Sequence, residues 1–300
     1  MSDQLTSERL LIYASEQYLL PADKVESRRL DAQHKFITTL FEGKLSTAPT
    51  NLTTGDRVLE SAAGTGIWAL EFLEENRADG VILDIECIDI SSAQFPANHP
   101  PQLHFSINSI VKLPSSPDWS DIFAYAHQRL LLFAMNESLW RLAVTELFRV
   151  IRPGGWVELV EIDLDLDGWS VLGPDTARLM SLGTALFDAK GVIRDLSVYL
   201  PGTLKDAGFV EVRCEPIRVL IGGESIHVHE FPTALTYSSE LWREVWMGMK
   251  GPVVEAGGYG IIETVEEYEA LVEASARECG FASKQRYINF HTSMAQKPEM

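Results

Sequence analysis

The residues best suited to hold a charged small molecule lie in a short turn near position 60. Glu60 closes an apolar run and is followed by Ser-Ala-Ala-Gly-Thr-Gly, in which Gly64 and Gly66 let the backbone approach a ligand closely. The turn has neither the third glycine of a dinucleotide fingerprint nor the Lys-Ser/Thr pair of a P-loop. An acid before a Gly-x-Gly turn instead suits a ligand with a cationic amino-acid end and no phosphate. S-adenosylmethionine is such a ligand.

A second acid, Asp89, ends the next predicted strand along the chain. At the carboxyl end of a second parallel strand, a carboxylate commonly accepts hydrogen bonds from ribose hydroxyls. Two plainer interpretations stay open. Glu60 could cap the helix that follows it, and Asp89 could be a solvated loop acid like Asp84.

The elements that position these residues alternate between short apolar runs and helical stretches. Strands are predicted at 57–60, 82–89, 103–107, 121–126, 156–161, 209–217 and 286–295. Helices are predicted at 26–41, 67–75, 139–150, 174–200, 200–207, 231–249 and 265–279, with a tight turn at 152–155. The alternation predicts an α/β fold, a parallel sheet with right-handed crossovers. The added helices are best placed as a lid over the carboxyl edge of the sheet.

Composition restricts the setting and the partners. The chain has 300 residues, 46% of them apolar, and a net charge of −18. An anionic field repels nucleic acid and anionic membrane surfaces, and no apolar run approaches the roughly 20 residues that span a bilayer. Three scattered cysteines suit neither a disulfide framework nor a zinc site, so we expect a cytoplasmic protein without a metal. Oligomeric state is left open.

Several stretches resemble the class I S-adenosylmethionine-dependent methyltransferases and, more narrowly, the fungal LaeA-like group. The turn at Glu60 is one of them, and the Arg-Pro-Gly-Gly turn before a strand that ends in Glu161 is another. The matching stretches are Glu60–Ala69, Cys87–Ser91, His127–Leu131, Leu147–Glu161 and, upstream, Tyr18–Pro21 and Glu26–His34. The resemblance covers roughly residues 16–217.

The resemblance implies a Rossmann-like, seven-stranded, mostly parallel sheet with an antiparallel last strand, helices on both faces and an added helical lid. It also suggests three parts. Residues 1–50 form a helical segment that folds over the site, residues 51–220 form the cofactor-binding core, and residues 221–300 form the lid and the last core strand.

S-adenosylmethionine is the implied cofactor, and a set of wall residues follows from the matching positions. Asn108 and Ser109 stand where relatives contact adenine, and an Asn side chain can pair with an amino group and a ring nitrogen. Ala62 stands where the family usually has glycine, and Asn108 where many relatives carry an acid. The expected cofactor-binding residues are Tyr18, Glu60, Ala62, Gly64, Gly66, Asp89, Asn108 and Ser109.

Three residues are candidates for catalysis. His127 ends the fourth predicted strand, beside the methyl group in this fold, and could be a general base or orient the acceptor. His34 could close over the site together with Tyr18 and Arg29, and Glu161 ends strand five at the same edge. The alternatives are a cofactor contact for His127, ordinary helix packing for the N-terminal residues, and contact with the lid for Glu161.

The expected function is methyl transfer to a small, largely apolar natural-product acceptor, at oxygen or nitrogen, in fungal secondary metabolism. Trp242, Trp246, Met247 and Met249 could form an apolar acceptor pocket or could simply be core. Three alternatives stay open: a LaeA-like regulatory protein, a module that binds a partner protein without turnover, and a cofactor-binding relative that assists a non-methylating rearrangement.

Overall fold

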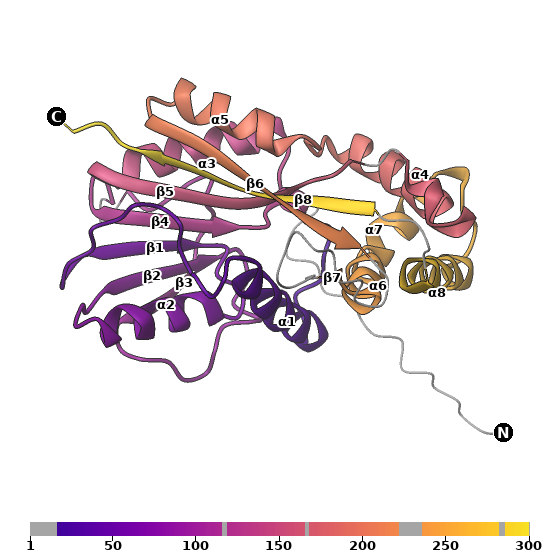
Figure 1. Cartoon of the computed structure of the whole chain (residues 1–300), viewed down its shortest axis with the longest axis horizontal. Coiled ribbons are helices and arrows are strands. Elements are labelled where there is room, and N and C mark those ends of the chain that lie inside the picture. Colours follow the sequence, from indigo (N-terminus) through magenta and orange to yellow (C-terminus); the bar gives the residue numbers. More distant parts are fainter. Residues whose placement is uncertain (1–16, 116–118, 166–167, 222–235, 282–285, 300) are drawn as a thin grey trace, which may run out of the picture.

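A computed structural model describes residues 17–115, 119–165, 168–221, 236–281 and 286–299. One sheet runs through the molecule in the strand order β3-β2-β1-β4-β5-β8-β6-β7 (Figure 1). The strands are β1 Arg57–Ser61, β2 Asp84–Asp89, β3 Leu103–Ile107, β4 Phe123–Arg129, β5 Ile151–Asp163, β6 Val210–Ile221, β7 Thr236–Tyr237 and β8 Arg286–Gln296. Strands β1 to β5 pair in parallel, and β8 runs antiparallel to both β5 and β6. The predicted mostly parallel sheet with an antiparallel last strand is confirmed.

Two expectations about the strands were wrong in detail. The two-residue strand β7 is additional, and it lies where the helix at 231–249 was expected. That helix, α6, begins at Ser239, and residues 231–235 lie outside the described residues. The turn expected at 152–155 lies within β5 instead. It forms a bulge, because Phe123 pairs with Ile151 whereas Tyr125 pairs with Trp156.

Helices cover both faces of the sheet (Figure 1). Trp68 and Phe72 of α2 pack with Val58 and Tyr125 on one face. On the other face, α3 and α5 bury one side each in a larger core. The helices are α1 Lys24–Leu40, α2 Ile67–Ala78, α3 Glu137–Val150, α4 Pro174–Lys190, α5 Leu196–Asp206, α6 Ser239–Gly248, α7 Lys250–Glu255 and α8 Val265–Phe281.

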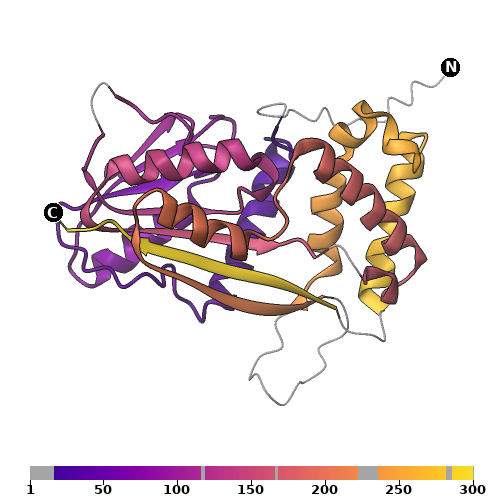
Figure 2. The same ribbon diagram turned by 90° about the horizontal axis from the view of Figure 1, so that it is seen from above.

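Helices α4, α6, α7 and α8 form a group beside the sheet, which we call the lid (Figure 2). The stretch predicted as one helix at 174–200 is broken at Gly191, which has φ 66 and ends α4. Within the described residues, no helix combines the length and apolar character needed to cross a bilayer. The division into 1–50, 51–220 and 221–300 stays a prediction, and residues 1–16 and 222–235 lie outside its described part.

Candidate functional site

A cavity of about 450 Å³ lies between the carboxyl ends of the central strands and the lid. Its wall combines the loop after β1, the ends of β2, β4 and β5, helix α1, and residues of α4, α6 and β8. Sites for small molecules typically have volumes of about 300–1,000 Å³ and are mostly apolar with a few placed polar groups. The cavity therefore has the size and the position of a small-molecule site at the carboxyl edge of an α/β sheet.

The loop after β1 forms the floor at one end of the cavity. Ala62, Gly64 and Gly66 all have positive φ angles, of 56°, 52° and 73°. Ala62 and Gly64 line the cavity, whereas Gly66 does not and instead precedes the first residue of α2. A Cβ atom on Gly66 would lie 2.5 Å from the Phe105 ring. Gly66 is thus required for packing and for its left-handed backbone, not as a wall residue.

Asp89 ties the end of β2 to this loop. Its Oδ2 accepts a hydrogen bond from the Gly64 amide at 3.0 Å, and its Oδ1 accepts one from the Ser91 amide at 3.1 Å. Burial raises the pKa of Asp89, and its backbone hydrogen bonds oppose that rise. Asn108 and Ser109 also line the cavity, and the Asn108 amide group donates to Ser106 Oγ at 2.8 Å. The residues expected at the second and third strand ends therefore share one wall.

His127 does not line the cavity, although a catalytic role was expected for it. Its ring is buried and stacks on Trp68 with centroids 3.8 Å apart, and its Nδ1 lies 2.6 Å from Glu60 Oε2. Burial lowers the pKa of His127 to about 3. Glu60 does line the cavity, and burial raises the pKa of its carboxyl group. In this geometry a buried neutral imidazole holds a wall carboxyl group and does not border the cavity, so the catalytic role of His127 stays a prediction without support from the arrangement.

His34 and Glu161 also lie behind the wall. His34 is buried between α1 and α2, with Nε2 2.7 Å from Glu71 Oε2 and Nδ1 2.8 Å from Arg129 Nη2. Glu161 accepts hydrogen bonds from two backbone amides in the segment after β4, and burial raises its pKa to about 8. Neither residue borders the cavity, so this arrangement does not support the catalytic role predicted for each.

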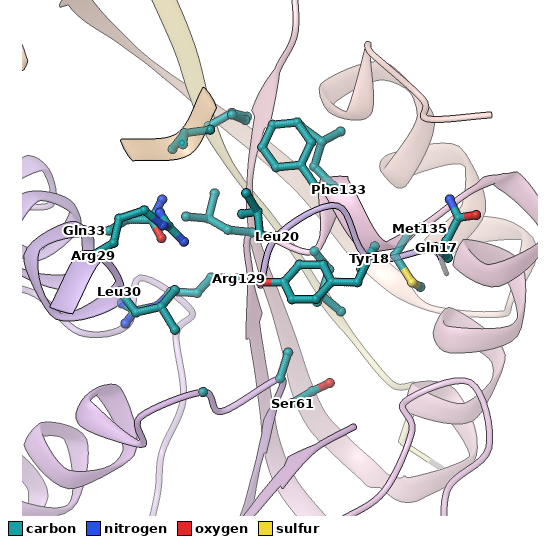
Figure 3. A pocket seen from close by; sticks show the side chains of 18 of the residues that line it. Gln17, Tyr18, Leu20, Arg29, Leu30, Gln33, Ser61, Arg129, Phe133 and Met135 are labelled. Carbon is teal, nitrogen blue, oxygen red and sulfur yellow. The ribbon is translucent and has the colours of Figure 1, made fainter. Parts of the chain in front are cut away.

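The segment before β1 supplies side chains that the sequence interpretation underrated. Figure 3 shows Tyr18, Arg29 and Gln33 at the cavity together with Arg129 from the end of β4. Arg29 is buried and ion-paired with Glu26 on the same helix. Arg129 was overlooked, although it follows His127 by two residues in a motif that was noted. The end of β4 at Arg129, at the carboxyl edge of the sheet, was the available signal.

The lid lines the other end of the cavity with aromatic rings. Trp169 stacks on Trp242 with ring centroids 4.9 Å apart, and the Trp242 Nε1–H group donates to Ser275 Oγ at 3.1 Å. The Trp169 Nε1–H group donates to the Asp165 carbonyl. Both indole N–H groups are therefore satisfied within the protein. The wall also includes Met180, Phe187, Trp246, Met249 and Phe290. Trp169 and Phe187 were not predicted, and Met247 does not border the cavity.

Comparison with known proteins identifies the family. A family model described as a methyltransferase domain matches residues 32–209, more than half of the chain. The chain belongs to this methyltransferase family. It is 31% identical over 206 residues to the N-methyltransferase sirN of Leptosphaeria maculans, covering 68% of this chain and 70% of sirN. The fungal resemblance is confirmed.

Two further relatives differ in how much of their length is matched. The methyltransferase grgD of a Penicillium species is 32% identical over 154 residues, which are 50% of this chain and 53% of grgD. The chain thus spans about half the length of grgD. The secondary metabolism regulator LAE1 of Gibberella fujikuroi is 25% identical over 290 residues, which cover 94% of this chain and 88% of LAE1.

The wall fits the cofactor that this methyltransferase family implies. S-adenosylmethionine has an adenosine half, an amino-acid end and a positive sulfur. Glu60 and Asp89 are acids on the wall, and Asn108 and Ser109 add polar groups beside Asp89. Ala62 and Gly64, which have a left-handed backbone, add little side-chain bulk to the wall between Glu60 and Asp89.

Proposed function

We propose that this methyltransferase carries a methyl group from S-adenosylmethionine to a small, largely apolar acceptor, at oxygen or nitrogen. One observation carries the proposal: a single cavity has acids and a glycine-rich loop at one end and stacked aromatic rings at the other. A shared cavity brings two ligands together without water between them, which is the main requirement of a direct displacement.

At the loop end, each predicted contact follows from the chemistry of the side chain. Asp89 accepts hydrogen bonds from the ribose hydroxyls, and Asn108 with Ser109 faces the adenine. Glu60 faces the ammonium group, with its carboxyl group oriented by His127 at 2.6 Å. Tyr18, on the segment before α1, covers the same end. When bound, the cofactor supplies a methyl group on a positively charged sulfur, which is a good electrophile.

At the lid end, the aromatic wall binds the acceptor by burying apolar surface and excludes water from the reacting atoms. The three residues expected to be catalytic lie behind the wall. Asp163 and Asp165 line the cavity, but the Asp163 carboxylate accepts from the Ser197 amide and hydroxyl at 2.9 and 2.6 Å, and Asp165 is ion-paired with Arg286. We therefore assign the rate enhancement to positioning and desolvation, which suits an acceptor that attacks without prior loss of a proton.

The biological setting follows from the named relatives. Methyltransferases such as sirN and grgD support a small-molecule acceptor from fungal secondary metabolism. A regulatory role is the second candidate, because the match to the regulator LAE1 extends over 94% of this chain. We also propose an intracellular setting, in keeping with three free cysteines.

The test separates these candidates in two steps. Calorimetry with S-adenosylmethionine and S-adenosylhomocysteine measures whether the pure protein binds the cofactor. Incubation with methyl-labelled S-adenosylmethionine and a panel of aromatic alcohols and amines, followed by mass spectrometry, then detects a product heavier by one CH₂ unit. Absence of binding would defeat the proposal. Binding with an isomerised product of unchanged mass would favour a cofactor-assisted rearrangement, and binding without turnover of any acceptor would favour the regulatory role.

A further inference from the structure

The amino-acid end of the proposed cofactor brings a carboxylate into the cavity as well as an ammonium group. Backbone N–H groups of the glycine-rich loop are the nearest potential donors for that carboxylate. Three of these amides are already engaged. Ala63 donates to the Ile88 carbonyl at 2.9 Å, Gly64 to Asp89 Oδ2 at 3.0 Å, and Gly66 to the Ala63 carbonyl at 2.8 Å. These three amides are therefore not available to the carboxylate, which leaves room for a side-chain donor.

Two cationic side chains stand on the described wall, Arg29 and Arg129. Arg29 is committed to Glu26 through two contacts, from Nε at 2.8 Å and from Nη2 at 2.6 Å. Arg129 differs. Among the described residues its guanidinium makes one hydrogen bond, from Nη2 to His34 Nδ1 at 2.8 Å. Its remaining N–H groups are the donors available to a ligand in the cavity.

His34 and Glu71, which do not border the cavity, fix the position of this guanidinium. His34 Nδ1 can accept from Arg129 only when the imidazole proton is on Nε2. Glu71 Oε2 lies 2.7 Å from that Nε2 and fixes this tautomer. The His34 side chain has no exposed surface and does not border the cavity, so any effect it has on a ligand passes through Arg129.

The position of Arg129 complements that of Glu60. Arg129 is the last residue of β4 and Glu60 the last but one of the neighbouring parallel strand β1, and both line the cavity. A carboxylate and a guanidinium at adjacent strand ends match the two charges of an α-amino acid, ammonium and carboxylate. Guanidinium groups bind carboxylates through two parallel N–H donors, which lysine cannot reproduce.

Building on the proposed function, we propose that Arg129 binds the carboxylate of the cofactor's amino-acid end, and that His34 and Glu71 are positioning residues for its guanidinium. The proposal assigns His34 a function that neither general-base catalysis nor simple helix packing requires.

The test compares two ligands that differ in one group. Calorimetry measures the affinity of each protein variant for S-adenosylhomocysteine and for its decarboxylated analogue, which keeps the amine. Arg129→Met should lower the affinity for S-adenosylhomocysteine by roughly tenfold to a hundredfold, and leave that for the analogue within about threefold. General damage to the fold would lower both affinities alike, so it leaves the ratio of the two affinities within one variant unchanged. Arg141→Met, which removes an exposed arginine paired with Glu137 on α3, is the matched control and should leave the ratio unchanged.

The positioning residues give a graded series. We call the ratio of the affinity for S-adenosylhomocysteine to that for the decarboxylated analogue the carboxylate preference. His34→Leu should reduce it, because Arg129 loses its only acceptor among the described residues. His34→Asn should restore part of it, since the Asn Oδ1 can accept from Arg129. Glu71→Gln keeps an acceptor for His34 Nε2 and should retain most of the preference.

Three results would overturn the proposal. One is an equal loss of both ligands in Arg129→Met, and another is no loss of either. The third is a His34→Asn variant that behaves like His34→Leu, which would make His34 merely structural. Wild-type protein that binds neither ligand would overturn the proposed function as well, and so is distinct from these three.

Discussion

The two ends of the cavity are built on different principles. At the loop end, the backbone itself is the scaffold: left-handed residues and amide hydrogen bonds fix Gly64 against Asp89. At the lid end, stacked rings from distant parts of the chain make the wall, with Trp169 against Trp242 and Phe133 against Phe187. A backbone-built site tolerates little change but leaves a readable motif. A site built by packing tolerates exchange of side chains and leaves no local signature.

The largest expected effect comes from breaking the loop end at Gly66. In Gly66→Val, a β-branched residue at φ 73 costs about 1–3 kcal/mol and the contact with Phe105 costs about as much again. Thermal unfolding should occur at a much lower temperature, and cofactor binding should be lost. Gly43→Val is the control, because Gly43 has φ 85 and nothing within 4 Å of an added Cβ. Equal shifts in the two variants would show that the Phe105 contact does not matter.

The next effect sharpens the function of the loop end. Asp89→Ala removes the carboxylate that holds the Gly64 amide and is proposed to hold the ribose. Hydrogen bonds to a charged group contribute about 1.5–3 kcal/mol, and about 1.4 kcal/mol corresponds to tenfold. Calorimetry should therefore find the affinity for S-adenosylhomocysteine reduced by roughly tenfold or more. Asp84→Ala, at the opposite end of β2 where Asp84 pairs with His104, should leave the affinity unchanged. An unaltered affinity in Asp89→Ala would mean that another residue holds the ribose.

At the lid end, a pair of glycines tests whether packing alone is at work. A Cβ on Gly183 in α4 would lie 2.5 Å from Trp246 Cη2, whereas Gly202 in α5 has nothing within 4 Å. Overpacking in Gly183→Ala should lower the free energy of unfolding by about 1–2 kcal/mol, and Gly202→Ala should raise it by about 0.5–1 kcal/mol. Urea titration measures both. Affinity for S-adenosylhomocysteine should be unaffected in each variant, and a loss in Gly183→Ala would contradict the separation of the two ends.

The smallest effect concerns the support of the loop end and its dependence on pH. The pKa of His127 is lowered to about 3 by burial, against about 6.5 in the unfolded chain. The unfolded state therefore binds the extra proton first, and stability is lost as the pH falls below 6.5 towards 3. Between pH 6.5 and 5 this group alone should lower the free energy of unfolding by about 1–2 kcal/mol.

The variant His127→Asn tests this loss of unfolding free energy. The Asn amide can still donate a hydrogen bond to Glu60, but the Asn side chain does not titrate between pH 6.5 and 5. Urea titrations at pH 6.5 and 5 should find a smaller loss of stability in the variant than in the wild type, with cofactor affinity nearly retained. An identical loss in both proteins would place the proton uptake on other groups.

The sequence predicted the regular framework better than the direction of side chains. Strand β3 lies at the predicted residues, and most other elements differ at their ends by a few residues. Of the expected cofactor-binding residues, all but Gly66 line the cavity, because strand ends and left-handed turns have local signatures.

The three expected catalytic residues do not border the cavity, for a physical reason. Position along a strand gives the edge of the sheet that a residue is near, but its distance from that edge and the helices packed against it decide what its side chain contacts. His127 pairs in register with Glu60 and Glu158 and packs on Trp68 of α2, whereas Arg129, two residues later, reaches the cavity. The lid wall was predicted only in part. Trp242, Trp246 and Met249 were candidates and line the cavity, but Trp169 was missed because it meets Trp242 only after the chain has folded.

The position of β8 has a consequence for how the chain reaches its final form. Residues 286–296 make the last strand in the sequence, yet they lie between β5 and β6 inside the sheet (Figure 1). During synthesis, β6 can pair only with the two-residue strand β7 until these residues have emerged, so the sheet stays split after β5. Pairing of β5 with β8 closes a loop of more than a hundred residues, a non-local step that slows folding. Because β8 also brings Phe290 to the cavity, the ligand site is completed together with the sheet, and late.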